Sequence, residues 1–291
     1  MSWIALALLC AFSLASADAA TKAWLQGFSA AELLLVRFGV SGVLLTPLLA
    51  GMPPLHDLPP AFWGWLALMV PLELGAMLLY MAAIRDHPLS LTLPYLAFSP
   101  VFVMLVAWLL LGERVSAQGA AGVLAVVAGS WLLNATHARM REWRTWAAPF
   151  GAILHQPGAR LMLAVAAIYA VTATYGKGAV QHLPPQYFGA FYFALLGACA
   201  FIAVALPAPR VLRRLACRPW AVLAVGGLNA LMVYTHFLAI QQVEVAYMIA
   251  VKRVSLLFGI LYGILLFREP GTMARIPGGA LMLAGVLLIV L

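Results

Sequence analysis

The sequence predicts an all-α polytopic membrane protein in which ten transmembrane helices form two inverted five-helix repeats. Its composition, its unbroken apolar segments and an internal repeat lead to this prediction. Hydrophobic residues make up 65% of the 291 residues and charged residues only 9%, whereas soluble domains are about 45–50% apolar and about 25% charged. Such a chain needs a lipid bilayer as its main solvent. The apolar runs do not alternate with polar residues, which excludes an outer-membrane β-barrel.

Ten apolar segments supply the predicted helices, because a helix that spans a bilayer needs about 20 residues. Paired prolines separate the second segment from the third and the sixth from the seventh. The first segment ends in small residues that suit a signal-peptidase site, but no basic residue precedes its apolar run, so we predict a retained helix. The segments lie near residues 3–20, 31–50, 61–84, 89–111, 117–136, 161–178, 186–206, 219–240, 245–267 and 275–291.

The chain also repeats itself internally. Five helices per half is an odd number, so the two copies lie in opposite orientations, as in many secondary transporters, with the substrate site near the midplane between them. Repeated glycines lie seven residues apart on one helical face, where small residues let helices pack closely. A shift of 156 residues superposes Ser99 on Ser255, Glu113 on Glu269, Gly122 on Gly278 and Gly129 on Gly285, and a shift of 155 superposes Lys22 on Lys177.

This repeat divides the chain into a first five-helix half at residues 1–136, a linker at 137–160 and a second five-helix half at 161–291. The linker interleaves basic and aromatic residues, which suits an interfacial segment at the level of the lipid headgroups, although an ordinary inter-repeat linker fits equally well. Glu113 and Glu269 end their helices beside arginine, and we interpret them as interfacial anchors or gate-side ion pairs. The linker residues concerned are Arg139, Arg141, Arg144, Arg160, Trp143, Trp146 and Phe150.

Two adjacent cations, Lys252 and Arg253, lie within the ninth apolar segment. A charge at bilayer depth costs about 2.5–3.5 kcal/mol on insertion scales, so both must face a polar interior that attracts negative charge. In a continuous helix, Ser255 and Tyr262 share the face of Lys252, and Arg253 is turned by about 100° from it. Arginine can grip a phosphate or carboxylate with two hydrogen bonds, and lysine acts as a point charge. The alternative is that one cation simply pairs with Glu73.

Glu73 lies near the centre of the third segment. This carboxylate either takes up and releases a proton during transport or is a fixed counter-ion for a buried cation. Arg37 is nearer one end of the second segment, where its side chain either snorkels towards the headgroups or binds inside the bundle. Together with Lys252 and Arg253, these groups carry three positive charges and one negative charge. The surplus of two positive charges predicts an anionic or zwitterionic ligand.

Further polar residues complete the predicted site. Tyr95 and Ser99 are four residues apart between two prolines of the fourth segment, where a bend is tolerated beside a cavity; core packing fits them as well. Asn229 and His236 share a face of the eighth segment, and we rank the histidine last, because a lone histidine there is more often a structural group. The predicted substrate-binding residues are Lys252, Arg253, Arg37, Glu73, Tyr95, Ser99, Ser255 and Tyr262.

Four short motifs resemble a known family. Residues 110–114 (LLGER) and 266–270 (LFREP) follow the fourth and ninth segments, and residues 36–38 (VRF) and 94–100 lie in the second and fourth. Together they resemble the drug/metabolite transporter (DMT) superfamily, EamA type. The resemblance implies a ten-helix carrier that moves small metabolites across the inner membrane by alternating access. The Lys-Arg pair also resembles one that plastid phosphate translocators carry in the ninth helix to hold the substrate phosphate; from it we take only a preference for anions.

These features predict a secondary active transporter of a small anionic or zwitterionic metabolite, phosphorylated or carboxylated. Two alternatives stay open: a proton-coupled exporter of amino acids or cationic drugs that uses Glu73, and a flippase of an anionic lipid-linked substrate. The motifs G-x-x-x-x-G-K-[ST], H-E-x-x-H and G-x-S-x-G do not occur, so neither ATP drive nor an enzyme is predicted. We expect no catalytic residue, cofactor, metal or nucleic acid. The expected partners are a small-molecule substrate, the lipid bilayer, and protons or a counter-substrate; the oligomeric state stays open.

The basic residues predict an orientation. Of the 17 lysines and arginines, three lie within the membrane, Arg114 and Lys177 lie in loops on one side, and the other 12 lie in loops on the opposite side. Basic loops face the cytoplasm, so we predict a bacterial-type cytoplasmic (inner) membrane protein with both termini outside.

Overall fold

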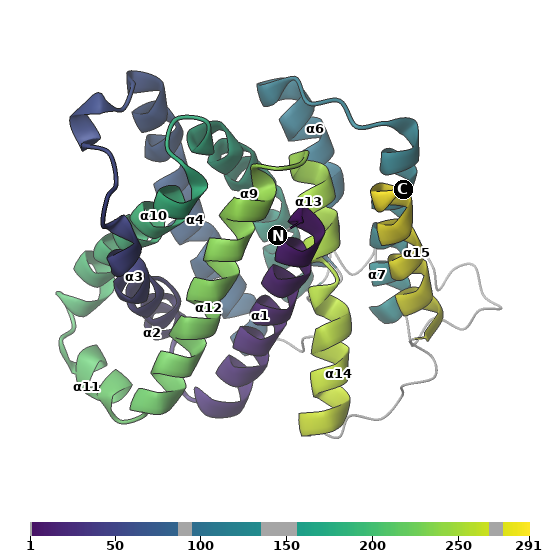
Figure 1. The fold of residues 1–291 in the computed structure, drawn as a ribbon. Coiled ribbons are helices and arrows are strands. Elements are labelled where there is room, and N and C mark those ends of the chain that lie inside the picture. The colour runs from purple at the N-terminus through teal and green to yellow at the C-terminus, as the bar shows by residue number, and fades with distance from the viewer. Residues whose placement is uncertain (1, 87–94, 135–155, 268–275) are drawn as a thin grey trace.

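The computed structural model describes residues 2–86, 95–134, 156–267 and 276–291 (Figure 1). All regular elements within these ranges are helical, which confirms the all-α prediction. In chain order they are α1 (Trp3–Trp24), α2 (Ala30–Leu35), η1 (Val36–Val40), α3 (Ser41–Leu45), η2 (Thr46–Leu49), η3 (Leu55–Asp57), α4 (Pro60–Asp86), α6 (Ser99–Leu111), α7 (Ala117–Asn134), α9 (Pro157–Val180), α10 (Pro185–Ala200), η4 (Phe201–Ala205), α11 (Arg210–Ala216), α12 (Pro219–Ile240), α13 (Val245–Lys252), α14 (Ser255–Phe267) and α15 (Ile276–Val290).

Membrane-spanning helices make up most of the bundle. In the described part of the chain, seven helical segments are long and apolar enough to cross a membrane, and α6, α7 and α15 are shorter apolar helices. The last residues of the predicted linker, from Pro157 on, belong to α9 rather than to a linker. The rest of the linker, up to residue 155, and the motif at 268–270 lie outside the described residues.

The second segment is a composite helix that contains Arg37. Ser29 begins it with a capping box: its Oγ accepts from the Glu32 amide at 3.2 Å, and Glu32 Oε2 accepts from the Ser29 amide at 2.7 Å. α2 then passes into the π-helical turn η1 before α3 continues. Single π-turns inside α-helices widen the backbone and are frequent at functional sites. Arg37 lies in this turn.

The fourth and ninth segments are both interrupted. A turn at residues 97–98 precedes α6, and a turn at 253–254 separates α13 from α14. At the second turn, the Val254 and Leu256 amides donate to carbonyls three residues earlier, each at 3.0 Å, instead of four. The two turns lie 156 residues apart, in the register of the internal repeat. The prediction of one continuous helix through the ninth segment is therefore wrong. Broken backbone at membrane depth is tolerated where it is buried in protein or lines a cavity.

Glycines bring α7 and α15 into backbone contact at one edge of the bundle (Figure 1). A Cβ on Gly122 would lie 2.7 Å from the Gly285 carbonyl oxygen, and one on Gly285 would lie 2.6 Å from that of Gly122. Gly129 and Gly278 form the same reciprocal contact, at 2.6 and 2.7 Å. Real Cβ atoms essentially never approach other atoms this closely, so the predicted packing role of these glycines is confirmed.

A second reciprocal contact joins α3 to α10. A Cβ on Gly42 would lie 2.5 Å from the Phe193 carbonyl oxygen, and one on Gly197 would lie 2.9 Å from that of Phe38. Gly42 and Gly197 are 155 residues apart in the sequence, and so are Phe38 and Phe193. Between these two close contacts, α1 packs against α12, and α4 packs against α9.

Candidate substrate-binding site

A cavity of about 110 Å³ lies at the centre of the bundle. One buried water needs about 10–15 Å³ of such volume, so the space holds several waters or part of a small solute. Eleven of its 22 lining residues are polar, and four of these are the predicted charged residues. The polar lining residues are Arg37, Glu73, Tyr80, Ser99, Tyr169, Thr172, Tyr192, Asn229, His236, Lys252 and Arg253.

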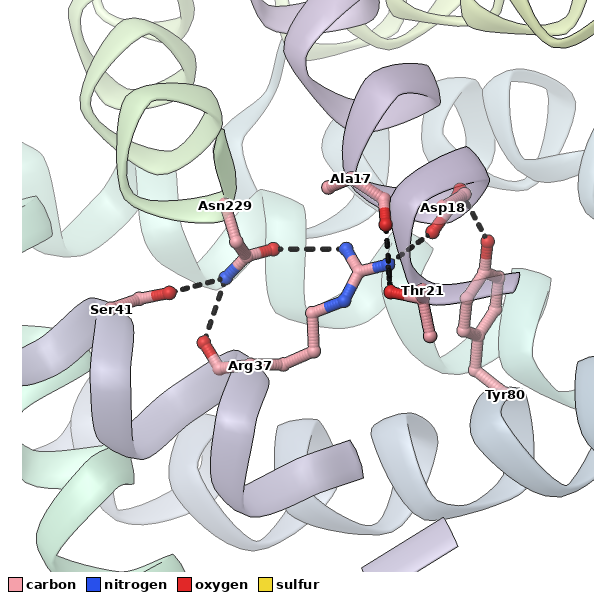
Figure 2. Close-up of polar contacts among 7 residues, drawn as sticks. All are labelled: Ala17, Asp18, Thr21, Arg37, Ser41, Tyr80 and Asn229. Atoms are coloured by element: carbon pink, nitrogen blue, oxygen red, sulfur yellow. Dashed lines mark hydrogen bonds and ion pairs between the residues drawn. The ribbon is translucent and has the colours of Figure 1, made fainter. Parts of the chain in front are cut away.

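Arg37 belongs to a hydrogen-bonded network on one wall of the cavity (Figure 2). Its Nη2 forms an ion pair with Asp18 Oδ1 at 2.5 Å and donates to Thr21 Oγ1 at 3.1 Å. Tyr80 OH donates to the other Asp18 oxygen at 3.0 Å. Only 2% of the Arg37 side chain is exposed. The snorkelling alternative is therefore wrong, and Arg37 is paired inside the bundle.

Asn229 holds the π-turn from the opposite side (Figure 2). Its Nδ2 donates to the Arg37 carbonyl oxygen at 2.8 Å and to Ser41 Oγ at 3.0 Å, and its Oδ1 accepts from Arg37 Nη1 at 3.3 Å. Ser41 Oγ in turn donates to the Gly226 carbonyl oxygen at 2.9 Å. One amide thus fixes both the backbone and the side chain of Arg37.

Lys252 and Arg253 stand at the break of the ninth segment. Arg253 is 5% exposed, and its Nε donates to Ser99 Oγ at 3.0 Å. Lys252 Nζ lies 3.5 Å from His236 Nδ1. Among the described residues, no carboxylate lies within 4.0 Å of either cation. Neither cation therefore forms the close ion pair with Glu73 that the alternative predicted.

Glu73 faces the cavity from α4, beside the Thr172 hydroxyl of α9. No cation of the described chain lies within 4.0 Å of it, although Lys252 is near enough for electrostatic attraction. Glu73 therefore forms no ion pair within 4.0 Å with a described cation, and its two predicted roles, as a proton carrier or as a fixed counter-ion, stay open. Of the two arginines that line the cavity, Arg37 is in an ion pair, and its partner is Asp18.

Two residues that line the cavity each contain a buried polar atom with no hydrogen-bond partner among the described residues. They are Arg37 Nε and Tyr192 OH, on side chains that are each 2% exposed. Buried polar groups are nearly always hydrogen-bonded to protein or to an ordered molecule. Both atoms are therefore candidates to bind a solute or water in the cavity.

Three predicted site residues lie away from the cavity lining. Tyr95 is buried against Trp131, with ring centroids 6.0 Å apart. Ser255 is 7% exposed at the start of α14. Tyr262 OH lies 2.6 Å from Ser16 Oγ, between α14 and α1. Ser255 and Tyr262 lie in α14, which the turn at 253–254 separates from Lys252 in α13, so counting residues along one continuous helix does not place them beside Lys252.

Several lining residues were missed by the sequence analysis. The largest omission is Asp18, which does not itself line the cavity but pairs with the lining residue Arg37 and lowers the local charge surplus from two to one. The internal repeat could have predicted other lining residues, because at several pairs of equivalent positions both residues line the cavity. These pairs are Arg37 and Tyr192 at a shift of 155, and Glu73 and Asn229, and Tyr80 and His236, at a shift of 156.

One end of the bundle is held by an ion pair between segments that are far apart in sequence. Lys177 Nζ lies 2.5 Å from Glu113 Oε1 and donates to the Val243 carbonyl oxygen at 2.6 Å. Glu113 Oε2 accepts from the Val245 amide at 2.9 Å, which caps α13. Glu113 thus bonds α9 and α13, and its ion-pair partner is Lys177 rather than the neighbouring Arg114. Glu269 lies outside the described residues.

The fold and its cavity define a polytopic helical membrane protein with a buried polar site between its helices. The model of the EamA-like transporter family matches residues 1–135 and 156–291. The chain therefore belongs to this family of membrane transporters, and the resemblance to EamA-type drug/metabolite transporters is confirmed.

Two known proteins show more distant similarity. The probable 4-amino-4-deoxy-L-arabinose-phosphoundecaprenol flippase subunit ArnE of Enterobacter sp. (strain 638) is 35% identical over 72 residues, which is 25% of this chain and 67% of that protein. A solved crystal structure of another protein aligns with 99% of this chain and 95% of its own, with 18% identity and a TM-score of 0.71. At that identity the alignment shows a shared fold.

Proposed function

We propose that this protein is a secondary transporter that moves a small metabolite with an anionic group across the cytoplasmic membrane by alternating access. One observation carries the proposal: Lys252 and Arg253 line a central cavity, and no carboxylate of the described chain lies within 4.0 Å of them. Charges at this depth persist when they face a hydrated site or a ligand. An anion that enters the cavity supplies the missing compensation.

Alternating access follows from a proposed arrangement of ten helices in two inverted halves, residues 1–136 and 161–291. The reciprocal contacts of Gly122 with Gly285 and of Gly129 with Gly278 support it, because exchanging the two halves converts one contact into the other. The helix breaks at 97–98 and 253–254 support it as well. Secondary transporters of this design bind substrate at discontinuous helices between the repeats and rock one repeat against the other.

A flippase of a lipid-linked anion is the second candidate. The observation that favours it is the similarity to a flippase subunit whose substrate is an amino sugar joined by phosphate to a lipid. Such a headgroup carries the anionic chemistry that the Lys252 and Arg253 site attracts. The two candidates differ in whether the substrate is released into water.

Transport into liposomes tests the proposal. Purified protein in liposomes should take up a labelled phosphorylated or carboxylated metabolite, and Lys252→Gln and Arg253→Gln should each abolish uptake. Arg210→Gln is the matched control, because it removes one positive charge from an exposed residue of α11. Normal uptake by both cavity variants would contradict the proposed site.

A second assay separates the two candidates. Liposomes that contain a headgroup-labelled, phosphate-linked polyprenol lipid report movement of the headgroup between leaflets. Movement of this lipid without uptake of the water-soluble anions identifies a flippase. Uptake of a water-soluble anion with no lipid movement identifies a metabolite carrier.

A further inference from the structure

We propose that the substrate carries both an ammonium group, held by Glu73, and a doubly negative acidic group, held by Lys252 and Arg253. This inference rests on the proposed function and narrows it to one class of solute. Amino phosphomonoesters and acidic amino acids share this chemistry.

The cavity presents opposite charges on separate walls. Glu73 reaches it from α4, in the first half, and the two cations reach it from the end of α13, in the second half. In the described chain, no ion pair within 4.0 Å joins Glu73 to either cation, yet Lys252 is close enough to Glu73 for electrostatic attraction. A solute with charged groups at both ends fills this gap better than a simple anion, which leaves Glu73 uncompensated.

The surroundings of Glu73 suit an ammonium group. Tyr169 and Tyr192 line the cavity and lie near enough to Glu73 to interact with it electrostatically. Aromatic rings attract cations through their faces. The buried Tyr192 hydroxyl, which has no hydrogen-bond partner among the described residues, can accept a hydrogen bond from an ammonium. Thr172 adds a hydroxyl oxygen beside the carboxylate.

The repeat shows that the two ends of the site differ in chemistry. The position equivalent to Glu73 is Asn229, whose amide is already engaged by Arg37 and Ser41. The positions equivalent to Lys252 and Arg253 are residues 96 and 97, a leucine and an alanine. The ammonium therefore has one place to bind in this cavity, and the acidic group has another.

For a solute that carries one ammonium, charge counting requires a doubly negative acidic group. Asp18 neutralises Arg37, so the remaining charges are Glu73, Lys252 and Arg253, with a surplus of one positive charge. A solute with one ammonium and two negative charges balances this surplus. The two Nη groups of Arg253 can still donate hydrogen bonds to an acidic group, because the hydrogen bond from Arg253 to Ser99 uses Nε.

This arrangement also couples binding to transport. A solute held at both ends bridges α4 of the first half and α13 of the second, whereas an amine-free anion is held from the second half alone. Rocking of the halves around a fixed site then favours solutes that carry both groups.

Paired probes that differ only in the amine test the proposal. Binding to the purified full-length protein is measured at about pH 8, where a phosphate monoester carries close to two negative charges. One pair is phosphoethanolamine and ethyl phosphate, and the other is glutamate and glutarate. Wild-type protein should bind the amine-bearing member of at least one pair about tenfold more tightly or better, as expected for a hydrogen bond between charged groups.

Substitutions locate the preference. Glu73→Gln should remove the preference for the amine. It should bind the amine-free probe at least as tightly as the wild type does, because the cavity has lost a negative charge, and this retained binding also shows that the variant is folded. Asp57→Asn removes a carboxylate with a 61% exposed side chain outside the cavity and should keep the preference. A preference for phosphoethanolamine alone identifies the acidic group as a phosphate, and a preference for glutamate alone identifies it as two carboxylates. A preference for the amine-bearing member of both pairs shows that the site accepts either acidic group together with an ammonium.

Other outcomes overturn the proposal, and they separate it from the proposed function. Equal binding of both members of both pairs to wild-type protein, or a preference that survives in Glu73→Gln, refutes the ammonium site and leaves the anion site standing. If the wild type binds none of the four probes, or Lys252→Gln binds them as the wild type does, the anion site fails and this inference fails with it.

Discussion

Replacing Asp18 by asparagine removes the ion-pair partner of the most deeply buried arginine. Asp18 Oδ1 lies 2.5 Å from Arg37 Nη2, and the other oxygen accepts from Tyr80 OH at 3.0 Å. Asparagine has nearly the same shape and keeps an acceptor oxygen for Arg37, while its amide nitrogen faces Tyr80 OH, which can accept from it; what is lost is the negative charge. The Arg37 charge then has no compensating carboxylate within 4.0 Å in the described chain.

The expected loss of stability follows from the burial of the pair. Removing one partner of a fully buried ion pair costs about 3–5 kcal/mol. Asp18 retains 28% exposure, against 2% for Arg37, and asparagine can hydrogen-bond to both Arg37 and Tyr80. Both effects reduce the loss, so we expect Asp18→Asn to lower the free energy of unfolding by about 2 kcal/mol.

A double-mutant cycle checks this reasoning. Unfolding of the purified protein in detergent is measured for Asp18→Asn, for Arg37→Gln and for the double variant, with Asp57→Asn as an exposed control. Because the double variant contains no unpaired buried charge, its loss should be smaller than the sum of the single losses by about 1 kcal/mol or more. Wild-type stability of Asp18→Asn, or additivity within about 0.5 kcal/mol, would refute the assignment of this pair as a structural element.

Other substitutions test the packing, one end of the bundle and the orientation. Gly122→Leu should prevent normal folding, because a Cβ there would lie 2.7 Å from a backbone oxygen. Loss of the monodisperse peak in size-exclusion chromatography would show this. Gly259→Ala should behave as wild type, because a Cβ at Gly259 would meet no atom within 4 Å. Glu113→Gln should lower the free energy of unfolding by about 1–2 kcal/mol, since the Lys177 pair is largely buried; an unchanged melting temperature would argue against it. A C-terminal reporter active only in the cytoplasm should be inactive, and strong activity would reverse the predicted orientation.

The sequence predicted the helical membrane fold and the centre of the site for the same reason. Apolar runs of bilayer length have few alternatives to helices, because backbone groups in lipid must be bonded internally. Charges within such runs have equally few places to go, so Arg37, Glu73, Lys252 and Arg253 could be expected to point inwards. All four line the cavity. Ser99 was predicted from its neighbouring prolines, and it also lines the cavity, as the partner of Arg253.

The remaining differences come from tertiary details that sequence spacing does not encode. Tyr262 was placed beside Lys252 by counting residues along a regular helix, and a single turn at 253–254 moved it to a contact with Ser16. Asp18 was overlooked because most of its helix is apolar, and because its role depends on Arg37, which lies 19 residues further along the chain. Which carboxylate reaches which cation is decided by helix packing, and a single sequence does not contain that information.

The glycine contact between α7 and α15 limits how the molecule can move. Two helices whose backbones are in direct contact cannot slide past each other without a steric clash, but they tolerate a small rotation about the contact. This pair lies at the edge of the bundle and joins the N-terminal part of the chain to the C-terminal part. It is therefore suited to act as a pivot, as is the reciprocal contact between α3 and α10 at the opposite edge, so motions that open the cavity should be largest between these two contacts.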